Sequence, residues 1–93
     1  MGKSTEPAKP GLGVLVAVFC YNEHVKIERT VSRFPADRDY DLVVMDDGST
    51  DDSVERIRKF PSVGILSHPQ TRGVGAAIRT VNQYALDNGS DVV

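Results

Sequence analysis

The sequence has little of what marks several common protein classes. It has one cysteine, Cys20, which excludes an internal disulfide and favours a reducing compartment. Aromatic residues are few, with three Tyr, three Phe and no Trp, and the net charge is -2. Because nucleic-acid-binding domains need a basic surface and often aromatic rings that stack on bases, nucleic acid is not an expected partner. The longest uncharged apolar run, residues 12–21, is about half of what a membrane-spanning helix needs. The sequence therefore predicts no transmembrane segment in this part.

Apolar runs of strand length alternate with helical patterns along the chain. Continuous apolar runs are typical of strands that are covered on both faces, as in parallel sheets. The sequence predicts strands at 13–19, 40–46, 62–68 and 91–93. Between them, apolar residues recur with the helical period, which predicts helices at 23–34, 52–60 and 73–88.

The three predicted helices have recognisable ends and faces. A proline follows each of the first two, and Gly89 is expected to cap the third. The residues expected on the apolar faces are Ile27, Thr30, Val31 and Phe34 in the first helix, Val54, Ile57 and Phe60 in the second, and Val74, Ala77, Ile78, Val81, Tyr84 and Ala85 in the third.

This order of elements predicts an α/β fold of the Rossmann-like, three-layer α/β/α type with a mostly parallel sheet. Residues 1–12, with Pro7 and Pro10, are expected to form a flexible lead-in. Because the chain stops inside an apolar run, we expect residues 13–93 to be the N-terminal part of a larger domain, truncated after the start of the fourth strand.

The stretch "VVMDDGSTDD" (43–52) places two acids at the end of the second predicted strand. Ligands of open α/β sheets bind at such strand ends. Asp46 and Asp47 are interpreted either as acceptors for a ligand's N–H and hydroxyl groups or as partners of backbone amides in a neighbouring loop. A joint metal site is disfavoured, because neighbouring strand residues point to opposite faces.

The rest of this turn has a structural explanation. Gly48 permits the tight turn, and Ser49 or Thr50 is expected to cap the next helix. Asp51 and Asp52 suit the positive end of that helix.

Two other loops are expected at the same edge of the sheet. In "FCYNE" (19–23), Asn22 can start the helix, while Tyr21 either packs in the core or lies against a flat ligand ring, with Glu23 near a sugar. This loop and the acidic turn should face one cleft, because they follow consecutive strands.

The third loop is "TRGVGAAIR" (71–79), with two glycines before a helix. The glycines either allow close helix–sheet packing or let a ligand approach the backbone. Arg72 is a candidate for a diphosphate or base contact, or else a solvated surface residue. His24 and His68 are expected to be ordinary surface or loop residues.

Together, "VLVAVFCYNE", "YDLVVMDDGSTDDS" and "RGVGAAIRTVNQYA" resemble the N-terminal half of family-2 glycosyltransferases with the GT-A fold, over residues 13–93. The third stretch resembles the branch of dolichyl- and polyprenyl-phosphate sugar synthases. Phe19 is a departure, since the family usually has proline there.

The resemblance implies transfer of a sugar from a UDP- or GDP-linked donor to an acceptor, with a lipid phosphate as one candidate. It assigns base and ribose contacts to Tyr21, Glu23 and Asp47, a supporting role to Asp46, and places near the nucleotide to Arg72 and Gly73. We expect a cytoplasmic protein, with parts of the chain after Val93 that attach it to the cytoplasmic face of a membrane.

The family's D-x-D motif, which carries Mg²⁺ or Mn²⁺, and its catalytic base would lie beyond Val93. We therefore expect no metal ligand and no catalytic residue in this chain, and no turnover by the 93-residue fragment alone. A non-catalytic nucleotide-binding or interaction module is the alternative. A nucleotidyltransferase is disfavoured, because no Gly-rich basic loop follows the first strand.

Overall fold

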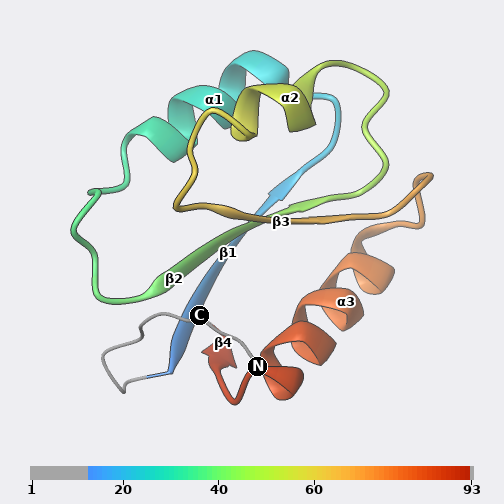
Figure 1. Ribbon diagram of the computed structural model, residues 1–93. Coiled ribbons are helices and arrows are strands. Elements are labelled where there is room, and N and C mark those ends of the chain that lie inside the picture. Colours follow the sequence, from blue (N-terminus) through green and yellow to red (C-terminus); the bar gives the residue numbers. More distant parts are fainter. Residues whose placement is uncertain (1–12, 93) are drawn as a thin grey trace.

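The structure is a computed structural model that describes residues 13–92 (Figure 1). The elements are β1 (Val14–Cys20), α1 (His24–Ser32), β2 (Asp41–Asp46), α2 (Ser53–Ile57), β3 (Gly64–Ser67), α3 (Val74–Asp87) and β4 (Asp91–Val92). They confirm the predicted α/β alternation. The expected lead-in at 1–12 and the last residue of the predicted fourth strand lie outside the described residues. No helix in the described part is long and apolar enough to cross a membrane.

The four strands are parallel and lie in the order β3-β2-β1-β4. Helices α1 and α2 cover one face of the sheet and α3 covers the other (Figure 1). Since Cys20 pairs with Asp46, β1 and β2 end at the same level. The chain turns back across β1 to reach β4, and such a reversal in an open sheet is where ligands bind, at the carboxyl ends of the strands.

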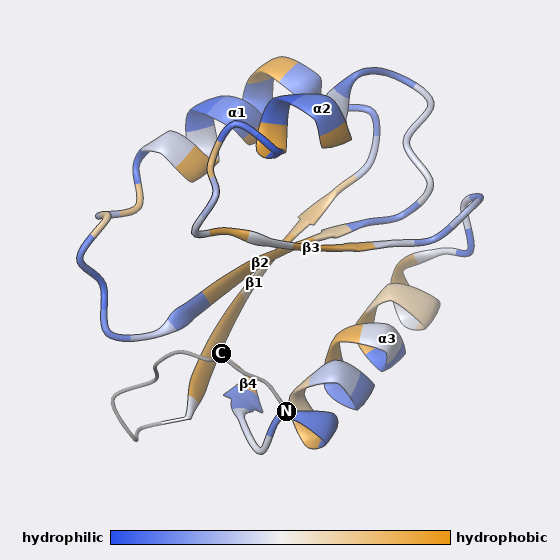
Figure 2. Cartoon of the chain, in the orientation of Figure 1, coloured by the Kyte–Doolittle hydropathy of each residue, from blue (hydrophilic) through white to orange (hydrophobic). Residues whose placement is uncertain are grey.

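The buried apolar side chains form one cluster on each face of the sheet. The cluster under α3 consists of Leu15, Val43, Met45, Ala77, Val81 and Ala85, and the one under α1 and α2 consists of Cys20, Ile27, Val31, Val44 and Ile57. Neighbouring residues of β2 thus serve opposite clusters, which explains why its apolar run is continuous. Figure 2 shows this apolar run as hydrophobic colouring along most of β1 and β2.

One part of the prediction for α3 is wrong. Val74 and Ile78 were expected on its apolar face, but they are 72% and 46% exposed, while Ala76 and Ala77 are buried. Val74 faces an open cavity beyond the strand ends. On its other edge from β2, β1 pairs with β4 only through Val14 and Leu15, so in the described part no strand lies on that edge of residues 16–20.

The C-terminal end of α3 is as predicted. Gly89 has a left-handed φ of 66°, and its N–H donates to the Leu86 carbonyl at 3.2 Å. The Ser90 N–H donates to the Ala85 carbonyl at 2.8 Å. This pair of bonds is the Schellman motif, which satisfies the last helical carbonyls and leads the chain directly into β4.

Candidate functional site

A cavity of about 210 Å³ opens at the carboxyl ends of β1 and β2. Its lining residues are Phe19, Cys20, Tyr21, Glu23, Met45, Asp47, Val74 and Ala77. The structure therefore brings together three of the predicted site residues, Tyr21, Glu23 and Asp47, and confirms that the first two loops share one cleft. Sequence reasoning missed the contribution of α3 to the lining. It also noted Phe19 only as a departure, yet β1 stays regular through this residue, which pairs with Met45.

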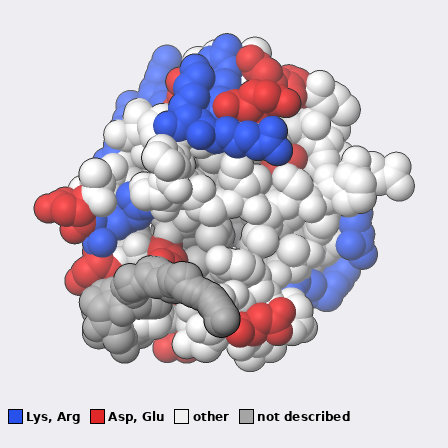
Figure 3. Space-filling model, in the orientation of Figure 1, with Lys and Arg blue, Asp and Glu red and all other residues white. Residues whose placement is uncertain are grey.

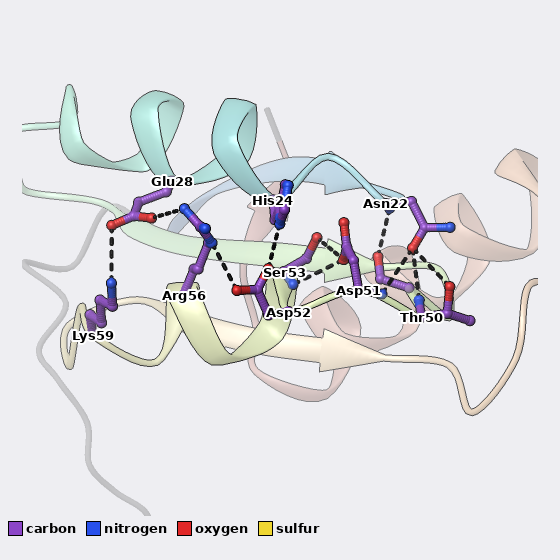
Figure 4. Close-up of polar contacts among 10 residues, drawn as sticks. Asn22, His24, Glu28, Thr50, Asp51, Asp52, Ser53, Arg56 and Lys59 are labelled. Atoms are coloured by element: carbon purple, nitrogen blue, oxygen red, sulfur yellow. Dashed lines mark hydrogen bonds and ion pairs between the residues drawn. The ribbon is translucent and has the colours of Figure 1, made fainter.

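Asn22 ties the loop after β1 to the loop after β2 (Figure 4). Its Oδ1 accepts from the backbone N–H groups of Thr50, at 2.7 Å, and Asp51, at 3.3 Å. Its own N–H donates to the Ser49 Oγ at 2.8 Å. To make these contacts Asn22 adopts a φ of 50°, in the left-handed region that Asn tolerates better than most residues. The two cavity loops are thus held together by direct hydrogen bonds.

The predicted starts of α1 and α2 need correction. Asn22 does not start α1, which begins at His24 after Glu23. Neither Ser49 nor Thr50 caps α2, because both are engaged with Asn22. Instead, Asp51 Oδ1 accepts from the backbone N–H of Ser53 at 2.9 Å.

The carboxylate of Asp47 is held by three donors. The backbone N–H groups of Arg72 and Gly73 donate to its Oδ1 and Oδ2, each at 2.9 Å, and His68 Nδ1 lies 2.8 Å from Oδ1. The interpretation as a partner of backbone amides in a neighbouring loop therefore holds for Asp47, which also lines the cavity. The hydrogen bond from His68 lowers the pKa of the Asp47 carboxyl, and the two amides lower it further, so the group is ionised at neutral pH.

Asp46 lies on the other side of the sheet from the cavity. Its side chain is buried, and its Oδ2 accepts from the Ser49 backbone N–H at 3.1 Å. Its Oδ1 is buried without a hydrogen-bond partner in the described part of the chain. Asp46 therefore supports the turn after β2 and does not line the cavity, in agreement with the expectation that the two adjacent acids point to opposite faces.

Arg72 and Gly73 reach the site mainly through their backbone. The Arg72 side chain is exposed and does not line the cavity. Gly73 has a φ of 96°, which directs its N–H to Asp47. The interpretation of the glycines as close helix–sheet contacts is wrong: Gly75 is exposed, and a Cβ placed there would approach only the side chain of Arg79.

Gly48 is required for two reasons, of which the sequence indicated one. Its φ of 79° suits the tight turn. In addition, a Cβ at this position would lie 2.4 Å from the Gln70 carbonyl carbon and the Thr71 nitrogen. The turn after β2 and the loop after β3 are therefore in backbone contact, and the Thr71 hydroxyl donates to the Asp47 carbonyl at 3.1 Å.

His68 is not the surface residue that was expected. It is buried, with Nδ1 against Asp47 and Nε2 2.8 Å from the Thr80 Oγ1. Its position directly after β3, at the edge that carries Asp47, was the signal in the sequence that could have identified it. His24, by contrast, is partly exposed on α1 and pairs with Asp52.

The cavity offers contacts for binding and little for bond-breaking chemistry. It combines a half-exposed Tyr21 ring with two carboxylates, those of Glu23 and Asp47. Burial raises the pKa of the Cys20 thiol, which makes it a poor nucleophile at neutral pH. Residues 13–92 contain no group of three or more His, Cys, Asp or Glu side chains that could hold a metal ion.

An α/β sheet with this strand order and a cavity at its carboxyl edge belongs to the class of open, nucleotide-binding type folds. The chain matches the family model of glycosyl transferase family 2 over residues 15–88 and so belongs to that family. No curated protein matches the sequence.

Among solved structures, the chain is similar to a mannosyltransferase from Pyrobaculum calidifontis in complex with GDP-Man and Mn²⁺. The TM-score is 0.66 and the sequence identity 26%, and the match confirms the GT-A type of α/β fold. The match covers 77% of this chain but only 24% of the mannosyltransferase chain.

Proposed function

We propose that residues 13–93 form the nucleotide-sugar-binding part of a glycosyltransferase. The enzyme would transfer a sugar from a UDP- or GDP-linked donor to an acceptor. The observation that carries this proposal is that Tyr21, Glu23 and Asp47 line one cavity at the carboxyl ends of β1 and β2 in a family-2 chain. The GDP-Man bound by the Pyrobaculum mannosyltransferase supports a nucleotide-linked donor.

We assign the cavity as the binding site for the nucleoside portion of the donor. Its volume of about 210 Å³ falls below the roughly 300–1,000 Å³ of complete small-molecule sites. Tyr21, which is 47% exposed, would stack on a base. Asp47 would accept an N–H of the base, and Glu23, at the N-terminal end of α1, would accept from ribose hydroxyls. Arg72, whose side chain is exposed next to Gly73, would reach the diphosphate.

The divalent cation belongs to other parts of the enzyme. In this reaction Mg²⁺ or Mn²⁺ neutralises the charge of the departing diphosphate. The described residues contain no group of three or more His, Cys, Asp or Glu that could hold a metal ion, and the match covers 24% of the mannosyltransferase chain. We therefore assign the metal ligands and the catalytic base to segments outside the described residues, and expect the 93-residue chain to bind nucleotide without turnover.

We further propose that the acceptor is a polyprenyl phosphate and that the enzyme acts at the cytoplasmic face of a membrane. The stretch "RGVGAAIRTVNQYA", which resembles the polyprenyl-phosphate sugar synthases, supports this assignment. An enzyme containing this chain should transfer sugar to a polyprenyl phosphate in detergent. Transfer only to a soluble oligosaccharide would contradict it.

Calorimetric titration of the chain with UDP and with GDP tests the binding site. Tyr21→Ala should weaken binding of the preferred nucleotide about tenfold, because stacking on one aromatic ring contributes about 1–3 kcal/mol and 1.4 kcal/mol corresponds to tenfold. Val25→Ala is the control: Val25 is similarly exposed but lies outside the cavity lining. Failure of both nucleotides to bind would contradict the proposal. Binding, combined with no transfer by any longer protein that contains the chain, would favour the non-catalytic module.

A further inference from the structure

His68 is the one buried residue at the carboxyl edge of the sheet whose two ring nitrogens are both engaged. Its backbone N–H donates to the Asp46 carbonyl at 3.0 Å, which extends the pairing of β3 with β2 by one residue. Its ring then bridges Asp47 and Thr80, a residue of α3. His68 thus connects three elements, and it does not itself line the cavity.

The Asp47 contact determines where the ring carries one hydrogen. An ionised carboxylate can only accept, so Nδ1 carries a hydrogen and donates to Asp47. Nε2 lies within hydrogen-bond distance of the Thr80 hydroxyl, which can either donate to it or accept from it. The Thr80 contact therefore holds the ring in the orientation in which Nδ1 meets Asp47.

The contact to His68 also determines which acceptor positions of Asp47 stay open. A carboxylate has about four lone-pair positions, and His68, Arg72 and Gly73 occupy three of them. The three donors come from two directions, the end of β3 and the start of α3, and prevent rotation of the carboxylate. One acceptor position then remains for a ligand that enters the cavity.

We propose that His68 is a positioning residue for the nucleoside site, acting through Asp47, with its ring orientation held by Thr80. This proposal rests on the proposed function. His68 holds the carboxylate in the orientation that a ligand N–H meets. A buried histidine serving packing alone would leave nucleotide affinity unchanged when replaced by a folded apolar variant.

The test compares four variants of the full chain by calorimetry with UDP and GDP, after thermal unfolding has shown that each one folds. His68→Leu should weaken binding about tenfold, since it removes a hydrogen bond to a charged group. His68→Asn should restore affinity to within about threefold, because its amide can replace the Nδ1–H donor. Thr80→Val should have an intermediate effect. His24→Leu, which changes the other histidine, should bind like the wild type.

Nitrogen NMR of the wild-type chain supplies a second readout, in which His68 should carry a hydrogen on Nδ1. A folded His68→Leu chain with wild-type affinity, or an Nε2–H tautomer, overturns the positioning role. If His68→Leu does not fold, His68→Gln takes its place, because its longer amide reaches toward Thr80 instead of Asp47. Equal affinities of the Gln and Asn variants then overturn the role. Absence of binding by the wild type would instead refute the proposed function, and the positioning role with it.

Discussion

On the face of the sheet covered by α1 and α2, charged side chains pair with one another above a sealed core, whereas the face covered by α3 holds a carboxylate beside an open cavity. Glu28 of α1 pairs with Arg56, at 2.9 Å, and with Lys59, at 3.4 Å. Arg56 also pairs with Asp52 at 3.1 Å. Charged side chains gather over these two helices, while the centre of the same view is uncharged (Figure 3).

The two faces differ in the groups that their carboxylates contact. The carboxylates over α1 and α2 meet charged side chains: Glu28 meets Arg56 and Lys59, and Asp52 meets Arg56. Asp47 meets backbone amides and a buried imidazole, which hold it beside the cavity. Ion pairs thus connect α1 and α2 on one face of the sheet, whereas hydrogen bonds orient the Asp47 carboxylate on the other.

The largest expected effect is at Gly48, where the turn after β2 contacts the loop after β3. Gly48→Ala should destabilise the fold by about 3 kcal/mol, because it adds left-handed strain to an overlap with the backbone of the loop after β3. Gly89→Ala is the control, with a similar φ and no atom within 4 Å of the new Cβ, and should cost about 1 kcal/mol. Denaturant unfolding measures both changes. Equal losses would mean that the two loops are not in backbone contact.

The second prediction concerns acid stability on the α3 face. Folding lowers the pKa of Asp47, so its stabilisation is complete above the unfolded-state value of about 3.9 and is lost as pH falls through the lower folded-state value. Between about pH 5 and about pH 2 the wild type should lose more stability than Asp47→Asn. Unfolding midpoints across this range test the sign. Parallel curves would show that Asp47 is not held as an ion.

The smallest effect is expected for the ion pairs on the α1–α2 face. Glu28→Gln should lower the melting temperature only slightly, because partly exposed pairs are screened by water and salt. The difference from the wild type should shrink further at high salt. A large, salt-independent loss would indicate that this network, like Asp47, has a role beyond pairing.

The sequence was sufficient for features that depend on local pattern and topology. Continuous apolar runs predicted strands buried on both faces, and parallel strands with consecutive connections placed Tyr21 and Asp47 at one edge. These inferences need only the spacing of apolar residues along the chain and the right-handed connection between parallel strands.

What could not be predicted depends on contacts between distant residues. The sequence does not show that His68, 21 residues from Asp47, is its partner, or that Asn22 engages Ser49 and so prevents it from capping α2. Periodicity likewise showed which side of α3 carries Val74, but not that this side opens onto a cavity.

The most direct test of the account is an amide NMR titration of the chain with UDP and with GDP. Binding of at least one nucleotide should shift the signals of Tyr21, Glu23, Asp47 and Gly73, and leave those at the opposite end of the sheet, such as Leu42 and Asn88, unchanged. Shifts confined to that opposite end, or none with either nucleotide, would contradict the central claim that the rim shared by β1 and β2 holds a nucleoside.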